Sequence, residues 1–435
     1  MLANPSIWGL LPLIIYIVLC FTRLKQLVIV SIAVFIGAVL SGQTVLSTAQ
    51  AIRAGLGSFL TYIGVIIMLG AGLGEVLDKT GVVRNIVIFV THKFGVNSQK
   101  KAIVVTMVTS ILLVSLLGTL AGANAIIAPL LIPIVAAVGI TPSTLAVVLH
   151  GAGASGLFLG PFTPPVVALM GFTGVTYPQV FFQAGLPVSI IMWVITFFMA
   201  LIIQKKTEGK YSYSHEDLNT VKLAEWKADK FTKRATVTFL ISMGILLIYG
   251  IIIKGGSSFA VAVMLIASIL TGLAGGMTLN DIFDSICVGS SRMVWLFFLF
   301  VLFNPFMQFV NDTGAFTALA NMLQPLIDRS GPVGFVTLST LVGIFGIPGA
   351  AVAQAQVIHE MFFPLAEQLN VPMTLWALVL LVGSQMTSFA FPGGDMVAEM
   401  GLARSNDLKA MFLNGVLITI AITIFVVIRA IMVML

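Results

Sequence analysis

The sequence predicts an all-α polytopic membrane protein made of two inverted-topology repeats. Of its residues, 59% are hydrophobic and only 9% are charged, and the mean hydropathy is +1.10. No Asp, Glu, Lys or Arg occurs from Ala102 to Gln204, a stretch too long and apolar for a soluble domain. Glycine and proline also interrupt apolar segments at matching places in the two halves of the chain. The lipid bilayer is therefore the expected surrounding of most of the chain.

Ten stretches have the roughly 20 apolar residues that a transmembrane helix needs. They lie near residues 5–22, 26–43, 56–75, 142–171, 186–205, 235–254, 258–275, 290–310, 372–402 and 409–433. The first has no basic n-region or cleavage motif, so it is predicted to be a span rather than a signal peptide. Two more apolar segments, 102–138 and 331–367, are too interrupted to form two clean spans each. We predict that each is a re-entrant hairpin.

Lys and Arg residues decide the predicted orientation, because cytoplasmic loops carry an excess of them. With residues 205–234 in the cytoplasm, all but four of the 22 basic residues fall in cytoplasmic loops. The exceptions are Arg53, Lys254, Arg329 and Arg429. Both termini are then non-cytoplasmic, in the cell (inner) membrane. The same bias explains the net charge of +6, so no nucleic-acid partner is expected.

Short sequence matches relate the two halves of the chain. At a constant shift of 230 residues, Pro142 matches Pro372, Gly153 matches Gly383, Met170-Gly171 matches Met400-Gly401, and Gly185 matches Gly415. Asp78 and Thr80-Gly81 correspond to Asp312 and Thr313-Gly314 at the slightly larger shifts of 234 and 233 residues. Each half holds five spans, an odd number, so the second copy would cross the membrane in the opposite direction. The predicted domains are a first repeat (1–204), a cytoplasmic amphipathic linker (205–234) and a second repeat (235–435).

Polar segments between the spans mix apolar and charged residues. In the linker, Leu218, Val221, Leu223, Trp226 and Phe231 stand among Lys and Glu, which favours an interfacial amphipathic helix. A disordered loop is the alternative. Similar mixtures at 44–55, 78–94, 278–285 and 313–328 are expected to lie flat along the membrane surface.

Two broken helices form the first part of the candidate site. Proline and glycine interrupt the apolar spans at 160–165 and at 391–395. Such breaks free backbone carbonyls and amides, which is tolerated at membrane depth only beside a cavity or other protein. Two breaks in matching positions are typical of secondary transporters.

The hairpin tips, 118–124 and 346–354, form the second part. Each begins with small residues, which let a ligand approach the backbone, and ends with an amide side chain, Asn124 or Gln354. The N-terminus of the helix that follows suits an anion. Alternatively, the glycines only permit tight helix packing. No Lys or Arg lies deep in a span, so an anionic substrate would depend on backbone and side-chain amides.

The predicted site residues fall into two sets, one for the substrate and one for the coupling ion. The predicted substrate-binding residues are Gly122, Ala123, Asn124, Thr163, Pro164, Gly349, Ala350, Gln354, Pro392, Gly393 and Gly394. The predicted coupling-ion residues are Ser155, Thr387, Ser388, Asp395 and Glu360. Asp395 is the main candidate, because an ionisable residue at membrane depth is a functional candidate by default. Alternatively, Asp395 caps the helix that follows the break.

Other polar residues at depth have plainer interpretations. His150 lies on an apolar helix and is interpreted as a packing histidine. His359 and Glu360 either pair internally or relay protons, and Glu399 and Glu75 are further acidic residues at depth. No nucleotide-binding motif, metal-ligand spacing or nucleophile–base arrangement occurs, so we expect no enzyme activity. No cofactor is expected apart from Na⁺, in the case that Na⁺ is the coupling ion.

The run of Gly70–Gly74, Asp78–Gly81 and Lys93–Gly95, followed by a hairpin and a proline-broken helix, resembles the ion transporter superfamily. Within it, the first half is most similar to gluconate permeases, which are related to C-type sodium/proton antiporters and dicarboxylate carriers. The resemblance implies a homodimer and an elevator mechanism, in which hairpins and broken helices slide against a scaffold. This chain departs from those relatives in having no histidine at 156–165 and Ala123-Asn124-Ala125 at the first tip.

The sequence therefore predicts a secondary active transporter. Its expected substrate is a small organic anion, a carboxylate or sugar acid, moved by symport with H⁺ or Na⁺. One alternative is a Na⁺/H⁺ antiporter in which Asp395 and Asn124 bind the ions. The others are an amino-acid carrier and the membrane subunit of a binding-protein-dependent transporter.

Overall fold

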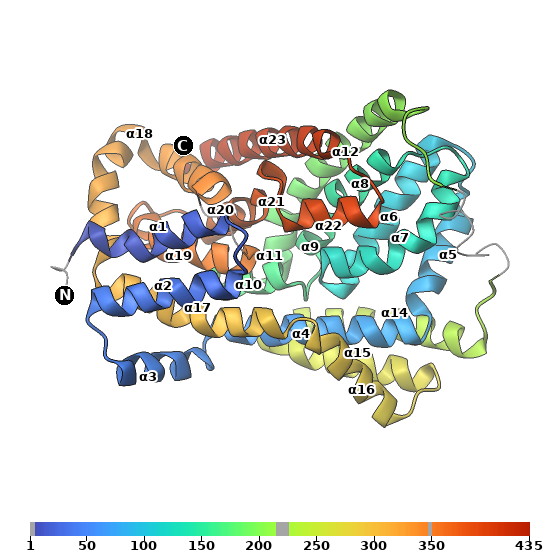
Figure 1. The fold of residues 1–435 in the computed structure, drawn as a ribbon, viewed down its shortest axis with the longest axis horizontal. Coiled ribbons are helices and arrows are strands. Elements are labelled where there is room, and N and C mark those ends of the chain that lie inside the picture. Colours follow the sequence, from blue (N-terminus) through green and yellow to red (C-terminus); the bar gives the residue numbers. More distant parts are fainter. Residues whose placement is uncertain (1–4, 215–225, 347–349) are drawn as a thin grey trace.

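The computed structural model describes residues 5–214, 226–346 and 350–435, and the secondary structure in these ranges is entirely helical (Figure 1). Nine helices in the described part are long and apolar enough to cross a membrane. Eight of them coincide with predicted spans, and the ninth, Gln99–Leu117, is the first arm of a predicted hairpin. The two other predicted spans are the shorter apolar helices Ile7–Cys20 and Gln26–Ser41. The all-helical polytopic prediction is confirmed.

The first half of the chain forms the helices up to α12. They are η1 (Ile7–Leu10), α1 (Leu11–Cys20), α2 (Gln26–Ser41), α3 (Val45–Gly55), α4 (Phe59–Lys79), α5 (Val82–Phe94), α6 (Gln99–Leu117), α7 (Leu120–Ala136), α8 (Pro142–Gly151), η2 (Gly153–Ser155), α9 (Gly156–Leu159), α10 (Pro164–Thr173), α11 (Tyr177–Val180), the π-helical turn η3 (Phe181–Gly185) and α12 (Leu186–Thr207).

The second half forms the helices from α14 onward. They are α14 (Lys230–Ile252), α15 (Gly256–Ala274), α16 (Leu279–Ser291), α17 (Val294–Asp312), α18 (Ala315–Gly346), α19 (Ala351–Gln368), α20 (Met373–Gln385), α21 (Thr387–Ala390), α22 (Gly394–Leu402) and α23 (Leu408–Met434). The predicted repeats would pair α1–α12 with α14–α23.

All four predicted interruptions are present. The hairpin arms α6 and α7 meet at Gly118-Thr119, and α18 ends at Gly346 before α19 begins at Ala351. The broken helices part at 160–163, between α9 and α10, and at 391–393, between α21 and α22. Residues 347–349, including the predicted site residue Gly349, lie outside the described residues.

The predicted surface segments are helical and lie at the two ends of the molecule. They correspond to α3, α5, α16 and the first part of α18, which kinks at Gly331. In Figure 1, α3 and α18 lie at one end of the long axis, whereas their counterparts α16 and α5 lie toward the other end. This arrangement supports the predicted inversion of the second repeat.

The linker is described only at its two ends. α12 continues to Thr207, and α14 begins at Lys230, so Phe231 belongs to a spanning helix rather than to a separate linker helix. Trp226 lies in an irregular stretch, where its ring lies 4.8 Å from the Arg84 guanidinium. Leu218, Val221 and Leu223 lie outside the described residues.

Two glycine contacts join the halves in a reciprocal way. Gly289 of α16 packs against the backbone carbonyl of Ala71 in α4, and Gly55 of α3 packs against that of Val301 in α17. In each case a Cβ atom would overlap the carbonyl oxygen, so no larger residue fits without a shift. Ala71 and Val301 are themselves 230 residues apart, the shift seen in the sequence matches.

A second pair of contacts explains the match of Gly185 with Gly415. Gly185 lies against the carbonyl oxygen of Phe158, and Gly415 lies against that of Phe389. Both phenylalanines belong to the last helical turn before a break. A glycine on the next membrane helix therefore holds each broken helix in place.

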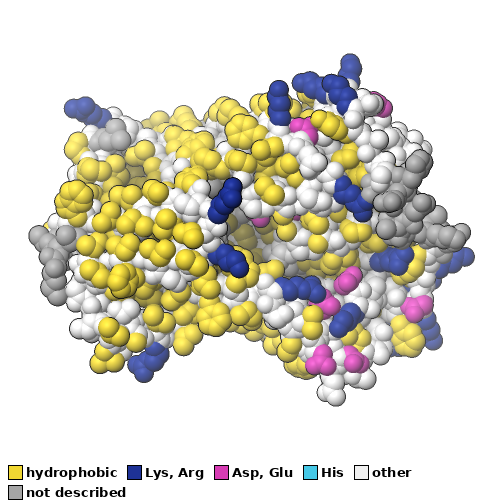
Figure 2. Space-filling model, viewed as in Figure 1, with side chains coloured by type: hydrophobic (Ala, Val, Ile, Leu, Met, Phe, Trp, Pro, Cys, Tyr) yellow, Lys and Arg dark blue, Asp and Glu magenta, His cyan; other side chains and the backbone are white. Residues whose placement is uncertain are grey.

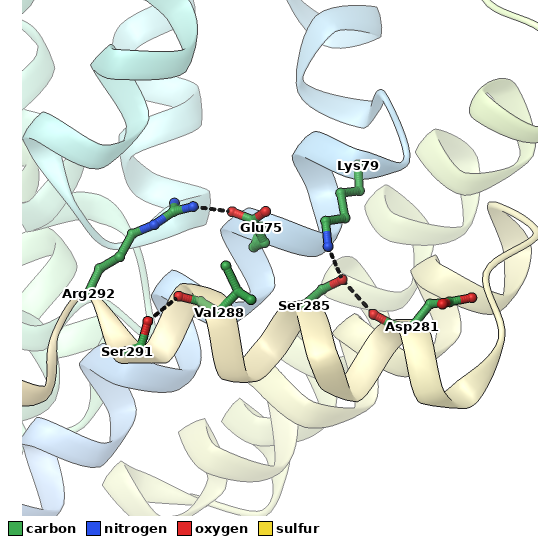
Figure 3. Close-up of polar contacts among 7 residues, drawn as sticks. All are labelled: Glu75, Lys79, Asp281, Ser285, Val288, Ser291 and Arg292. Atoms are coloured by element: carbon green, nitrogen blue, oxygen red, sulfur yellow. Dashed lines mark hydrogen bonds and ion pairs between the residues drawn. The ribbon is translucent and has the colours of Figure 1, made fainter.

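Polar contacts add to the α4–α16 interface (Figure 3). Arg292 donates to Glu75 at 2.7 Å, and Lys79 donates to Ser285 at 3.1 Å. At the start of α16, the hydroxyl and backbone N–H of Thr278 donate to Asp281, and these bonds lower the pKa of that carboxyl. Glu75, an acidic residue noted at depth, thus pairs with an exposed arginine.

We predict that Gly289→Ala lowers the free energy of unfolding by about 1–3 kcal/mol, because the added methyl overlaps the Ala71 carbonyl. Gly244→Ala in α14 is the matched control, since a Cβ there meets nothing within 4 Å. The control should be neutral or stabilise by up to about 1 kcal/mol. Denaturant unfolding in detergent measures both variants. Equal stability of the two would contradict the close approach of α4 and α16.

Candidate functional site

Asn124 lies at the centre of a buried hydrogen-bond network that joins four helices, α6, α7, α8 and α22. Its side chain is completely buried in the second turn of α7, just after the hairpin tip. The amide oxygen accepts from the Ser110 hydroxyl of α6 at 2.7 Å. The amide nitrogen donates to the carbonyl of Leu149 at 3.2 Å and to the carboxylate of Glu399 at 2.9 Å. Asn124 therefore ties the first hairpin to both broken helices.

Glu399 is the ionisable member of this network. It is completely buried on α22, and Asn124 binds only one of its two carboxylate oxygens. The other oxygen, Oε1, has no hydrogen-bond partner among the described residues. An ionised carboxylate is costly to bury without a counter-charge. A proton or a cation bound at Oε1 would remove that cost.

Asp395 lies one helical turn before Glu399. Residues four apart in a helix are neighbours on one face, so the two carboxylates share a side of α22. Asp395 is exposed, whereas Glu399 is buried. Gly393 occupies the N-cap position, so the interpretation of Asp395 as the cap is wrong. The pair extends from the molecular surface into the buried network.

The molecular surface is hollowed beside this region. Figure 1 places α22 alongside α7 and α8 near the middle of the molecule, and both pack against it. Figure 2 shows a hollow near the centre of the same face, with Asp and Glu side chains visible in it and Lys and Arg around it.

The linker holds the far end of α22. The Tyr213 hydroxyl donates to the carbonyl of Ala403, which follows the last residue of α22, at 3.1 Å. Burial raises the pKa of Tyr213, so its hydroxyl stays protonated and acts as a donor. α22 is thus fixed at one end by Tyr213 and at its centre by Asn124.

Gln354 makes the corresponding network in the second hairpin. Its amide nitrogen lies 2.8 Å from the Gly343 carbonyl, 3.1 Å from the Gly383 carbonyl and 2.6 Å from the Thr387 hydroxyl. Its amide oxygen is buried without a partner in the described part of the chain. Unlike the first network, this one contains no carboxylate. The two hairpins therefore present one acidic and one neutral polar site.

Three predicted coupling-ion and substrate hydroxyls bind nearby carbonyls. Ser155 donates to Ala152, Thr163 to Leu157 and Gly160, and Ser388 to Gln385. These bonds satisfy carbonyls that lie near the breaks, where regular helical bonding stops. Each hydroxyl oxygen keeps acceptor capacity, and its role as a cation ligand stays a prediction.

The remaining predicted residues surround the breaks and tips. Ala123 and Pro164 are buried, Ala350 precedes α19, and Gly122 approaches Thr119. Pro392, Gly393 and Gly394 form the second break and the first position of α22. The N-termini of α7, α10, α19 and α22 lack a side-chain cap within the described residues. Because α10 begins with Pro164 and Pro165, which have no N–H, backbone N–H groups are available mainly at the two tips and at the second break.

Glu360 and the two histidines lie outside these networks. Glu360 accepts from Gln356 of its own helix at 2.6 Å. His359 accepts from the Trp376 ring nitrogen at 3.1 Å and stacks on Phe363, so it does not pair with Glu360. His150 is completely buried and its ring packs against Phe389 with ring centroids 4.4 Å apart, but neither of its ring nitrogens has a hydrogen-bond partner among the described residues.

Ser110 and the central position of Glu399 were not predicted. Ser110 is one hydroxyl in a long apolar helix, and nothing local in the sequence distinguishes it. The sequence spacing could have identified Glu399, because this residue lies four positions after Asp395 on the same short helix. Only the packing of α22 against α7 shows which of these two acids enters the site.

Comparison with known proteins supports a transporter fold. Residues 4–174, less than half of the chain, match the model of the Na⁺/H⁺ antiporter family. No match was found among curated protein sequences. The fold is similar to that of MtrF from Neisseria gonorrhoeae, described with a class of antimetabolite efflux pumps, at 15% identity and a TM-score of 0.60. That likeness covers 87% of this chain and 82% of MtrF.

A second solved structure gives the same result. The YdaH transporter from Alcanivorax borkumensis, described as having an unusual topology, is 16% identical with a TM-score of 0.57. The likeness covers 87% of this chain and 86% of YdaH. This chain thus has the fold of polytopic membrane transporters. The comparisons support the transporter part of the sequence resemblance without singling out gluconate permeases.

We predict that the Asn124–Glu399 pair is strongly coupled. In a double-mutant cycle with Asn124→Ala and Glu399→Ala, the coupling energy should be about 1.5–3 kcal/mol, because each partner satisfies a buried group of the other. The matched control is the Gln356–Glu360 pair within α19, for which we expect about 0.2–0.5 kcal/mol. Unfolding in detergent measures both cycles. A coupling no larger than the control would show that the buried contact is absent in solution.

Proposed function

We propose that this protein is a secondary active transporter in which Glu399 binds and releases the coupling ion. The observation that carries the proposal is the unpartnered Oε1 oxygen of a completely buried carboxylate. Asn124 holds the other oxygen and so fixes the position of the carboxyl group. The match of residues 4–174 to a family of ion exchangers and the transporter fold support the same conclusion.

H⁺ is the ion that suits Glu399 best. A proton needs one oxygen, and Glu399 has one oxygen without a partner, whereas Na⁺ requires several oxygen ligands. The exposed Asp395 carboxylate, one turn away, would pass ions between solvent and the buried site. Neutralising Glu399 would let α22 move through an apolar environment without a buried charge. Release of the proton would reverse this effect on the opposite side of the membrane.

Cation exchange is the favoured reaction. Among the described residues, no Lys or Arg makes a hydrogen bond or ion pair with Asn124, Glu399 or Gln354, so the site has acidic and neutral groups only. An acidic site attracts cations, and Na⁺ exchanged for H⁺ is the simplest case. Under this proposal the protein needs no cofactor other than the transported ion.

Organic-anion symport is the second candidate. It is favoured by the N-termini of α7, α19 and α22, which lack side-chain caps and can donate backbone N–H groups to a carboxylate. A sugar acid, as the resemblance to gluconate permeases implies, is one such substrate. An amino acid would use the same N–H groups for its carboxylate and Glu399 for its amine.

The proposed movement of the protein during transport is inferred from the sequence resemblance. Hairpins and broken helices would move as one body against a scaffold that includes α2, α4, α15 and α17, in an elevator movement. We further propose a homodimer in the cell (inner) membrane, with both termini non-cytoplasmic. α4 of the first half packs against α15 of the second, and α17 of the second half packs against α2 of the first. These contacts support a scaffold to which both repeats contribute.

We predict that Glu399→Gln abolishes proton-coupled transport, because glutamine keeps the shape of the side chain but cannot bind and release a proton. Proteoliposomes with an internal pH dye and an imposed Na⁺ gradient measure the flux. Asp395→Asn should slow the flux without abolishing it, since Asp395 lies at the entrance. Glu367→Gln, an exposed acid on α19, is the control and should match the unmodified protein.

The same vesicles separate the candidate reactions. A pH change driven by Na⁺ alone indicates antiport, whereas a change that requires an added carboxylate, sugar acid or amino acid indicates symport. Unchanged flux in Glu399→Gln would remove Glu399 from the coupling mechanism in either case.

A further inference from the structure

A cavity of about 320 Å³ lies apart from the two amide networks, between the first broken helix and the start of the second repeat. One wall comes from the first break, α10 and α11, and the other comes from α14 and α15. Its volume is at the lower end of the range for small-molecule sites. None of Asn124, Glu399 and Gln354 lines it. The proposed ion site therefore gives no reason for this cavity.

The lining is apolar with a single cation. Phe162, Met170, Leu247 and Phe259 contribute apolar side chains, and Lys254 is the one charged residue among the described residues of the lining. Lys254 is exposed, and its ammonium group makes no hydrogen bond or ion pair within the described residues. An apolar body with one negatively charged group would complement both features.

The cavity borders the surface that faces lipid. Only 28% of the most apolar part of α14 is buried within the protein. Ile248 and Ile252, which flank the lining residue Ile251, are 61% and 73% exposed. Apolar side chains this exposed on a membrane helix contact lipid. An occupant can therefore enter from the bilayer, which favours an amphiphile over a water-soluble solute.

We propose that this cavity binds an anionic phospholipid, with an acyl chain along the aromatic lining and the phosphate beside Lys254. Basic residues close to the ends of membrane helices attract anionic headgroups. Lys254 lies in the turn between α14 and α15, and a lysine at a helix end can extend to the headgroup level. The acyl chain would replace contacts that an empty apolar cavity lacks.

The bound lipid would act on the first broken helix. Tyr177, which lines the cavity, donates its hydroxyl to the carbonyl of Leu159 at 2.7 Å, immediately before the break. Phe162 lies within the break itself. A lipid between these residues and α14 would hold the broken helix against the second repeat. Lipid composition would thereby regulate how readily this helix moves.

Thermal unfolding of the full chain in detergent tests the proposal. Phosphatidylglycerol and phosphatidylcholine with identical acyl chains are added separately, and glycerol phosphate serves as the headgroup without a chain. Phosphatidylglycerol should raise the melting temperature by about 2–4 °C more than phosphatidylcholine, because ligand binding stabilises the folded state. Glycerol phosphate should have no effect at the same concentration.

Two variants locate the effect. Lys254→Ala removes the cation, and Leu247→Trp fills the cavity; each should remove the advantage of phosphatidylglycerol. The matched controls are Arg53→Ala, another exposed cation predicted on the same side of the membrane, and Ile248→Trp, an exposed neighbour of Leu247. Both controls should respond as the unmodified protein does. If Leu247→Trp fails to fold, Leu247→Phe replaces it.

Three results would overturn the proposal. One is equal stabilisation by the two lipids in the unmodified protein. Another is an advantage of phosphatidylglycerol that persists in Lys254→Ala and Leu247→Trp. The third is equal stabilisation by glycerol phosphate, which would identify a site for soluble anions. None of these readouts depends on ion transport, so the lipid site and the proposed function are tested independently.

Discussion

The structure depends on satisfying the polar groups that broken helices expose inside an apolar protein. Lipid and packed side chains offer few hydrogen-bond partners, so each break needs partners from elsewhere in the chain. Asn124 and Gln354 reach from the hairpins to carbonyls near the ends of α8 and α20, ahead of the breaks, and the Thr163 hydroxyl binds a carbonyl at the first break. The hairpins and broken helices are thereby bound to each other. That mutual dependence supports the proposed movement of these elements as one body.

Glycine positions fix how closely these elements approach. Gly185 and Gly415 each meet the carbonyl of the helical turn before a break, while Gly55 and Gly289 each join the two halves. The contacts occur in equivalent pairs because the same packing problem is solved once in each half. Their recurrence supports descent of the two halves from one module. It also explains why the sequence matches between the two halves are mostly glycines and prolines. These residues are required by the backbone geometry at their positions rather than by the chemistry of their side chains.

The proposed chemistry lies where the two halves differ. The position in the first half that corresponds to Glu399 is Leu169, and the one that corresponds to Asp395 is Pro165. Only the second broken helix therefore carries acids, and its partner Asn124 comes from the first hairpin. The acidic network joins the two halves. A symmetric scaffold thus holds one asymmetric site.

The sequence by itself determined the apolar spans, the four interruptions and the match between halves, because composition and the backbone limits of proline and glycine are local properties. It also marked Asn124, Gln354 and Asp395 as residues of interest. Tertiary structure decided their roles, because burial and pairing depend on which helices pack together. Contact of α22 with α7 buries Glu399 against Asn124, whereas Asp395, one turn earlier, stays exposed. Likewise, Lys254 gains significance only from the cavity beside it, which is formed by segments far apart in the chain.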